Sequence, residues 1–249
     1  MDIHTLFDDK SDLYAKSRPQ YPQELYEWLS GICPSNKSVW DVGCGNGQAS
    51  VDLIRFFESV QSTDVSPSQI KNAPSINGIT FSVQQAERTN FASQSFDAIC
   101  VAQALHWFDY EAFWPEVFRV LKPEGVFCAW GYCWPHVSPK IDALLASSFL
   151  SVIRPYWPEQ NKLLWDGYVD VPFPFKTRIA TPQISLTMHL SIEQFFAYLH
   201  SWSATRRCVD MQGNAFFNAS FNQISSVWGA AESRQISMDL VLIAGKNAS

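Results

Sequence analysis

Three glycines at alternate positions are the first residues of this 249-residue sequence whose types and spacing suggest chemistry. Gly43, Gly45 and Gly47 directly follow an apolar segment and precede one with the apolar spacing of a helix. Glycine permits a tight turn and lets a ligand approach the backbone, and a helix N-terminus offers unpaired N–H groups. The pattern therefore predicts a ligand-binding turn between a strand and a helix. The alternative is a plain connection without a ligand.

Two acidic residues extend this pattern. Asp41 precedes the first glycine by two positions, and Asp64 lies near the end of the next predicted strand. An acid there can accept hydrogen bonds from both hydroxyls of a ribose, although it can also simply cap the following helix. The third glycine of the dinucleotide fingerprint is missing, because Gln48 stands in its place counted from Gly43. The G-K-[ST] of a phosphate-binding P-loop is missing too.

Strands and helices alternate around these residues. The predicted strands cover 37–42, 59–65, 79–83, 96–102, 125–130, 183–190 and 235–244. The predicted helices cover 20–31, 48–57, a segment with Ser66 as N-cap and Pro67 at its first position, about 109–121, 138–153 and 192–202. Such alternation implies right-handed crossovers and a mainly parallel sheet. We expect an α/β fold with a Rossmann-like, seven-stranded, mostly parallel sheet, helices on both faces, and a helical and aromatic cover from the second half.

Composition excludes several classes of protein. Hydrophobic residues make up 47%, enough for a sizeable core, and the net charge of −6 argues against nucleic-acid binding through a broad basic field. The longest uncharged stretch, 125–139, is too short and too interrupted for a membrane helix. The acidic start lacks a signal-peptide core, so we expect a cytoplasmic protein. Six cysteines without a C-x-x-C and five scattered histidines favour reduced thiols and no metal site.

Six segments in the same order resemble the class I S-adenosylmethionine-dependent methyltransferases, with a type 11 methyltransferase domain. They are FDDKSDLYAKSRPQYP (7–22), DVGCGNGQ (41–48), STDVSPSQI (62–70), QQAERTNFASQSFD (84–97), ALHWFD (104–109) and FRVLKPEGVF (118–127). The Y-x-x-x-R-P-x-Y-P pattern, the H-W-F block and residues 198–203 resemble the branch of trans-aconitate methyltransferases. Two positions depart from the family: Gln85 stands where relatives often have Asp, and Glu124 replaces the first glycine of a K-P-G-G turn.

The resemblance implies that the cofactor is S-adenosyl-L-methionine, released as S-adenosyl-L-homocysteine. The three glycines then bring the backbone against the methionine and ribose parts, Asp64 holds the ribose, and Val65 packs on the adenine. Gln85 and Ala86 reach the adenine edge, and the Gln103 carbonyl accepts from the amino group. The expected cofactor residues are Tyr14, Arg18, Asp41, Gly43, Cys44, Gly45, Gly47, Asp64, Val65, Gln85, Ala86 and Gln103. Of these, Arg18 would pair with the cofactor carboxylate and Tyr14 would close over the sulfonium, unless both belong to a solvated surface helix.

We expect one domain over residues 1–249. It would consist of an N-terminal helical segment (1–36), a cofactor-binding core (37–135), helices with a sixth strand and cover insertions (136–234), and a final strand (235–246). Residues 154–182 carry five prolines and two tryptophans, and their aromatic content predicts a cover rather than a linker.

Fewer residues indicate where the acceptor of the methyl group would bind. His106, just past the fourth strand, either orients an acceptor or acts as a base, although its block also recurs as packing in the resembling branch. Trp107, Trp130, Tyr132 and Trp202 are candidates for the walls of the acceptor pocket, with core packing as the alternative. A carboxylate acceptor needs no base, whereas a phenol or an amine must lose a proton.

The predicted function is methyl transfer to a small molecule, on a carboxylate or hydroxyl oxygen. The alternatives are a methyltransferase acting on protein or nucleic acid, a non-catalytic cofactor-binding module and a nicotinamide oxidoreductase, which the missing third glycine disfavours. No nucleic-acid or membrane partner is expected, and the oligomeric state is left open.

Overall fold

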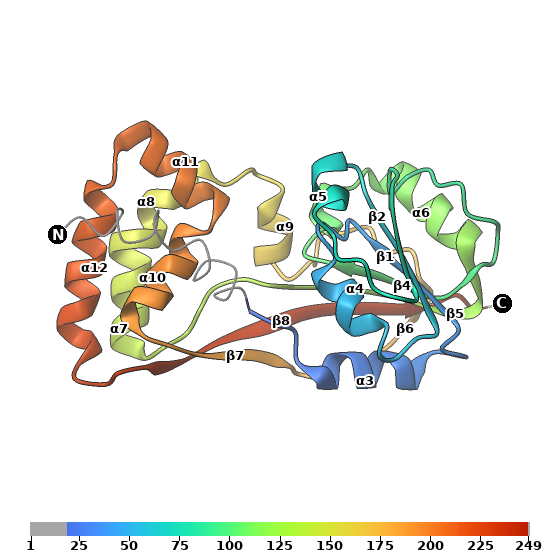
Figure 1. Ribbon diagram of the computed structural model, residues 1–249, viewed down its shortest axis with the longest axis horizontal. Coiled ribbons are helices and arrows are strands. Elements are labelled where there is room, and N and C mark those ends of the chain that lie inside the picture. Colours follow the sequence, from blue (N-terminus) through green and yellow to red (C-terminus); the bar gives the residue numbers. More distant parts are fainter. Residues whose placement is uncertain (1–18, 249) are drawn as a thin grey trace. The chain divides into compact units, whose positions relative to one another are not determined.

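The computed structural model describes residues 19–248, and within it the chain forms two compact units (Figure 1). The sheet unit comprises Tyr21–Cys133, Lys162–Ile184 and the chain from Asp239 onward, and the helical unit comprises Trp134–Asn161 and Ser185–Met238. The single domain expected from the sequence stays a prediction, because compact clustering does not show whether the two units unfold together.

The sheet has the strand order β3-β2-β1-β4-β5-β8-β6, and β7 also pairs with β8. The strands are β1 (Ser38–Val42), β2 (Ser59–Asp64), β3 (Ile79–Val83), β4 (Phe96–Ala102), β5 (Leu121–Tyr132), β6 (Thr177–Arg178), β7 (Ser185–Leu190) and β8 (Arg234–Lys246). Neighbours among β1 to β5 are parallel, whereas β8 is antiparallel to β5. The seven predicted strands and the fold class are confirmed, and the two-residue β6 is an unpredicted eighth strand.

The order of strands reverses at β1, which pairs with β2 on one side and β4 on the other. In open α/β sheets, ligands bind beyond the carboxyl ends of the strands at such a switch point. The chain leaves β1, β2 and β4 at this edge through Gly43, Val65 and Gln103, respectively. The topology therefore brings the three segments singled out by sequence to one edge of the sheet.

Helices cover both faces of the sheet unit. They are α3 (Gln23–Ile32), α4 (Gln48–Leu53), α5 (Pro67–Lys71), the short 3-10 turn Leu105–Trp107, α6 (Tyr110–Val120) and α9 (Asn161–Trp165). On β5, Phe127 packs against Phe113 of α6, whereas Trp130 packs edge-on against Tyr26 of α3. Residues an odd number of positions apart in a strand point to opposite faces, so α3 and α6 lie on opposite sides.

Two local predictions for these helices had different outcomes. The predicted cap of α5 is confirmed, because the Ser66 side chain accepts from the Gln69 N–H and Pro67 occupies the first helical turn. The predicted extent of α4 is wrong, because the helix ends at Leu53 rather than at residue 57. Phe57 is still buried, but in the turn that leads into β2.

The segment 154–182, expected as one cover, is divided between the units. Residues after Lys162 belong to the sheet unit, and the side chains of Leu164, Tyr168, Val171 and Phe175 join its core. Phe175 stacks on Phe127 with ring centroids 5.5 Å apart. This part of the segment therefore completes the core.

The helical unit contains α7 (Pro139–Leu144), a π-helical stretch (Leu145–Leu150), α8 (Ser151–Ile153), the 3-10 turn Arg154–Tyr156, α10 (Ile192–His200), α11 (Ser203–Gln212) and α12 (Ala215–Trp228). Its core is aromatic, with Phe149, Phe196 and Phe217 fully buried and in edge-to-face contact. Ser191 and Gln194 form a capping box that starts α10. Between residues 19 and 248, no helix combines the length and apolarity needed to cross a membrane.

The substituted turn at Glu124 keeps the conformation that a glycine would adopt. Glu124 has a φ of +62°, in the left-handed region that side chains rarely enter. Its N–H donates to the Asn247 carbonyl and its carboxylate lies 2.8 Å from Lys246 Nζ. Contacts with the end of β8 thus hold the strained turn, far from the edge where the glycine loop lies.

Asp97 ties the amino ends of three strands together. Its Oδ2 accepts from the N–H groups of Lys37 and Ser38 at 3.1 and 2.9 Å, and its Oδ1 accepts from Lys122 Nζ at 2.8 Å. Burial would raise the pKa of Asp97, but the hydrogen bonds from Lys122 and Ser38 hold that pKa below its usual value.

We predict that Asp97→Asn lowers the free energy of unfolding by about 1–3 kcal/mol at neutral pH. Because the pKa of Asp97 is lower in the folded than in the unfolded protein, its carboxylate stabilises the fold at pH values above the unfolded pKa, which is about 3.9. This contribution is lost as the pH falls through the folded pKa. The difference in unfolding free energy between the wild type and Asp97→Asn should therefore shrink in acid. Urea unfolding followed by tryptophan fluorescence between about pH 7 and pH 2 measures both effects. Asp170→Asn, at an exposed position, is the control, and an equal loss in both variants contradicts the prediction.

Candidate functional site

The glycine loop uses its three glycines for different purposes. Gly43, Gly45 and Gly47 have φ values of +66°, +56° and +90°, all in the left-handed region. A Cβ on Gly43 would lie 2.7 Å from the Ala104 side chain, and one on Gly47 would lie 2.5 Å from the Phe81 ring. A Cβ on Gly45 would meet only a side-chain oxygen 4.0 Å away. Gly43 and Gly47 are therefore needed for packing, whereas Gly45 borders open space.

Asp64 anchors this loop to the end of β2. Its Oδ2 accepts from the Gly45 N–H and its Oδ1 accepts from the Ser66 N–H, both at 2.9 Å. The Cys44 N–H donates to the Thr63 carbonyl beside it. Each carboxylate oxygen has a second lone pair, so Asp64 can hold the loop and still accept hydrogen bonds from a ligand.

Asp41 lies beneath the loop. It is fully buried, and its Oδ2 accepts from the Ser50 hydroxyl, which in turn accepts from Ser62. Its Oδ1 makes no hydrogen bond among the described residues. Burial, aided by the charge of Asp64, raises the pKa of Asp41 to about 6 despite the bond from Ser50. Asp41 thus joins β1 to α4 and β2, and the neighbouring Cys44 side chain is buried too.

The next strand ends present apolar surface. Val65 follows β2 and is 63% exposed, and Val83 at the end of β3 is 50% exposed. Val83 pairs with Asp64 in the sheet, so the two valines belong to adjacent strand ends. Gln85 is exposed and Ala86 is buried. The two valines therefore form exposed apolar surface beside Asp64.

Gln103 shapes the exit from β4. Its φ is +57°, which for a residue with a side chain costs about 1–3 kcal/mol. Its N–H donates to the Trp130 carbonyl at 2.8 Å, and its side-chain amide donates to the Tyr132 carbonyl at 3.1 Å. These bonds fix the strained turn against the end of β5.

His106 and Trp107 follow in the same turn but differ in exposure. His106 is buried, with Nδ1 3.4 Å from the Tyr168 hydroxyl, whereas Trp107 is 52% exposed. Burial lowers the pKa of His106 to about 4 and raises the pKa of Tyr168. The imidazole is therefore neutral at physiological pH.

The other three residues expected to line the acceptor pocket differ in burial and in the unit to which they belong. Trp130 is fully buried, and its ring meets Tyr21 edge-on at 5.7 Å. Tyr132 is half-buried, 6.2 Å from the same Tyr21 ring. Trp202 belongs to the helical unit, where its ring lies 6.1 Å from Trp134. Of the four candidates, Trp107 and Tyr132 thus present surface within the sheet unit.

Some expected site residues lie outside the part of the chain that the structure describes, and some residues near the proposed site were not predicted from the sequence. Tyr14 and Arg18 lie outside the described residues. Tyr21 and Tyr168 were not predicted as site residues. Tyr21 is part of the quoted R-P-x-Y-P pattern, whereas Tyr168 lies in the segment 154–182, which was expected only to form a cover. Between residues 19 and 248, no three side chains of His, Cys, Asp or Glu come together as metal ligands would. All six cysteines are free thiols.

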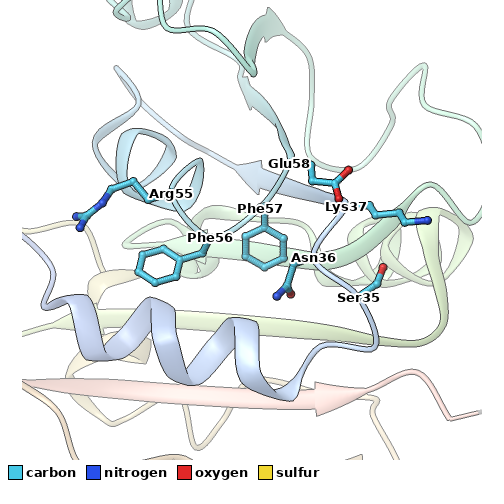
Figure 2. Close-up of a pocket in the computed structure, with 7 residues that line it drawn as sticks. All are labelled: Ser35, Asn36, Lys37, Arg55, Phe56, Phe57 and Glu58. Carbon is cyan, nitrogen blue, oxygen red and sulfur yellow. The ribbon is translucent and has the colours of Figure 1, made fainter.

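A separate hollow lies at the other edge of the sheet, where the chain enters β1 and β2. Figure 2 shows its lining residues, with the Arg55 and Lys37 side chains extending in opposite directions. Its volume is about 400 Å³, and it is lined by Ser35, Asn36, Lys37, Arg55, Phe56, Phe57 and Glu58. Its place at the amino ends of the strands separates it from the glycine loop.

The sheet order, the glycine loop at the switch point and the acid that ends β2 define the class I methyltransferase fold. A family model described as a methyltransferase domain, type 11, matches residues 40–129. A methyltransferase-family protein of Dictyostelium discoideum is 33% identical over 207 residues, which cover 80% of this chain and 78% of that one. An uncharacterized methyltransferase of Mycobacterium tuberculosis is 32% identical over 125 residues, which are 50% of this chain and 51% of that protein.

A solved structure from Anaeromyxobacter dehalogenans, described as a type II methyltransferase, agrees along almost the whole chain. Its TM-score is 0.87 and its identity is 32%, with 93% of this chain and 98% of that chain covered. This chain therefore belongs to the class I S-adenosylmethionine-dependent methyltransferases of the type 11 family, and it is a methyltransferase. The trans-aconitate branch stays a prediction.

We predict that Gly47→Ala destabilises the protein more than Gly167→Ala does. Both glycines are left-handed, at +90° and +71°, but an added Cβ would strike Phe81 at position 47 and nothing within 4 Å at position 167. The shared backbone penalty is about 1 kcal/mol, and the clash adds about 1–3 kcal/mol. Urea unfolding of the two variants measures the difference, and equal midpoints would show that Phe81 does not confine Gly47.

Proposed function

We propose that this methyltransferase transfers the methyl group of S-adenosylmethionine to an oxygen of a small-molecule acceptor. The observation that carries the proposal is the Asp64 carboxylate, which holds the glycine loop at the sheet edge where His106 and Trp107 also emerge. One edge thereby offers both a nucleoside site and an aromatic acceptor side.

The residues present fit the cofactor. Gly45 borders open space, so its backbone is accessible to the methionine and ribose parts. Asp64 keeps lone pairs for the ribose hydroxyls. The exposed valines 65 and 83 offer apolar contact for the adenine, with Gln85, Ala86 and the Gln103 carbonyl at its edge. Tyr14 and Arg18 are proposed for the methionine end by resemblance alone.

The cofactor supplies an electrophilic methyl group on a sulfonium, and the chain supplies alignment and a site that excludes water. Alignment of two reactants contributes up to about 7–11 kcal/mol in model reactions. His106 is buried and neutral, beside the exposed Trp107 ring, so this side of the edge suits an acceptor with an apolar body and one reactive oxygen.

The net charge of the protein also bears on the class of methyl acceptor. The net charge of −6 favours a small molecule over a nucleic acid. The resemblance to trans-aconitate methyltransferases makes small carboxylic acids the first acceptors to test. Hydroxyl compounds of the same size are the second class of acceptor to test.

We predict that the protein binds S-adenosylmethionine and S-adenosylhomocysteine but not NAD. Asp64→Ala should raise the dissociation constants at least tenfold, about 1.4 kcal/mol, because it removes the ribose acceptor and the anchor of the loop. Calorimetric titration measures these constants, with circular dichroism to confirm folding. Asp170→Ala is the exposed control. Unchanged binding in Asp64→Ala, or no binding of either sulfur compound by folded wild-type protein, would contradict the proposed site.

We further predict that Gly45→Ala weakens cofactor binding more than it weakens the fold. Its Cβ enters space that the protein leaves open, so the loss of stability should equal that of Gly167→Ala, another glycine with a positive φ and nothing within 4 Å of the added Cβ. Titration with S-adenosylhomocysteine and urea unfolding of both variants separate the two effects. Wild-type affinity in Gly45→Ala would show that the cofactor does not approach this glycine.

A further inference from the structure

The loop of residues 84–91, called the β3–β4 loop below, begins beside the acid that we assign to the ribose. The Gln84 N–H donates to the Asp64 carbonyl at 3.2 Å. Within the loop, the Arg88 N–H donates to the Gln85 carbonyl at 3.4 Å, and these two residues form an isolated antiparallel bridge. The β3–β4 loop therefore carries Gln85 on a tight turn next to Asp64.

Glu116 of α6 binds the β3–β4 loop at Thr89. Its Oε1 accepts from the Thr89 N–H at 2.8 Å and from the Thr89 hydroxyl at 2.5 Å. Arg119, one turn further along α6, donates to both oxygens of the Glu116 carboxylate and to the Phe91 carbonyl, at distances of 2.7 to 2.8 Å. The ion pair thereby joins the helix to the loop at positions 89 and 91.

The Glu116 carboxylate is buried beneath the β3–β4 loop. Burial would raise the pKa of this carboxyl, but the hydrogen bonds from Arg119 and Thr89 hold that pKa below its usual value. A buried carboxylate with several donors is fixed in place, because a displacement leaves charge or donors unpaired. An exposed ion pair at the same helical spacing would contribute little to stability. The burial of this pair therefore indicates a role in placing the loop rather than in strengthening the helix.

Apolar packing holds the β3–β4 loop at two other points. Ala86 is buried in the core of the sheet unit. The ring centroid of Phe91 lies 5.6 Å from that of Trp40 and 5.0 Å from that of Phe96. Residues 87–90, between these points, are all polar and depend on hydrogen bonds for their position. Two of those bonds come from the carboxylate on α6.

We propose that Glu116 is a positioning residue that acts through Thr89 to hold the β3–β4 loop where it recognises the adenine base of the cofactor. The inference rests on the proposed function, because it concerns the cofactor of the same methyl transfer. The Gln85 side chain is exposed and the Ala86 N–H donates to no described group, so both are available to a base.

Recognition of the base is measured with S-inosylhomocysteine, in which hypoxanthine replaces the adenine of S-adenosylhomocysteine. Adenine presents an amino donor and a ring acceptor along one edge, whereas hypoxanthine presents a carbonyl acceptor and an N–H donor there. A loop held in one position matches the first pattern and opposes the second, whereas a loosely held loop adjusts to both. The ratio of the two dissociation constants therefore reports the position of the loop separately from the stability of the fold.

Calorimetric titration of the full chain gives both constants. We expect a ratio of about ten in favour of S-adenosylhomocysteine in the wild type, falling about threefold or more in Glu116→Ala and in Thr89→Val. Thr89→Val keeps the ion pair with Arg119 and removes only the hydroxyl link to the loop, so it decides the question even where Glu116→Ala does not fold. Thr89→Ser restores the hydroxyl and should restore the wild-type ratio.

Asp97→Asn is the matched control, because it changes another buried carboxylate of the sheet unit, at the amino ends of the strands. It should lower stability in urea and leave the ratio unchanged. A ratio that stays at the wild-type value in Thr89→Val, or that falls equally in Asp97→Asn, overturns the positioning role and leaves the cofactor site standing. A wild-type ratio near one overturns it as well, because the loop then does not recognise the base. Failure of folded wild-type protein to bind S-adenosylhomocysteine contradicts the cofactor site, and this inference with it.

Discussion

The bond between the Asp64 carboxylate and the Gly45 N–H is the interaction on which the site depends. The same carboxylate also accepts from Ser66, so one side chain fixes the glycine loop after β1 to the start of α5 after β2. Two charge-assisted bonds hold the loop in a conformation that only glycines adopt without strain. Because Gly45 borders open space, the carboxylate that shapes the loop is also the group that we propose to bind the ribose.

The two edges of the sheet perform different tasks. At the amino ends, Asp97 gathers β1, β4 and β5 through hydrogen bonds and an ion pair with Lys122, which favours stability. At the carboxyl ends, buried Asp41, strained Gln103 and strained Tyr168 occur together, and each is costly for the fold alone. Costs of this kind concentrate at functional sites, where they position groups for binding or chemistry. Positive φ values also occur at the amino ends of the strands, at Gln94 and Glu124, so the switch point rather than the strain distinguishes the carboxyl edge as the proposed site.

Local signals in the sequence were sufficient to predict the strands and the helix cap around the glycine loop. The glycine spacing, the apolar strands and the Ser66 cap depend on neighbours within a few residues, and the structure confirms the strands and the cap. The family resemblance gave the fold class and the activity. Glu124 shows the limit of such signals, because a glycine-like turn is kept by contacts with residues more than 120 positions away.

The acceptor side was less predictable, because its geometry depends on packing between distant segments. Tyr168 meets His106 across 62 positions of sequence, and neither periodicity nor a motif indicates that contact. Trp130 illustrates the reverse case, because a tryptophan at the end of a predicted strand could face a pocket, yet its ring is fully buried. Only the fold shows that residues after Lys162 return to the core of the sheet unit.

The central claim is that the cofactor binds where Asp64 holds the glycine loop. Amide hydrogen exchange with and without S-adenosylhomocysteine tests it most directly, because the exchange of each peptide reports its own local opening. The account predicts slower exchange in the peptides that contain residues 43–47, 64–66 and 84–86, with the 35–37 and 55–58 segments unchanged. Protection confined to the helical unit, or to the hollow beside Arg55, would contradict it.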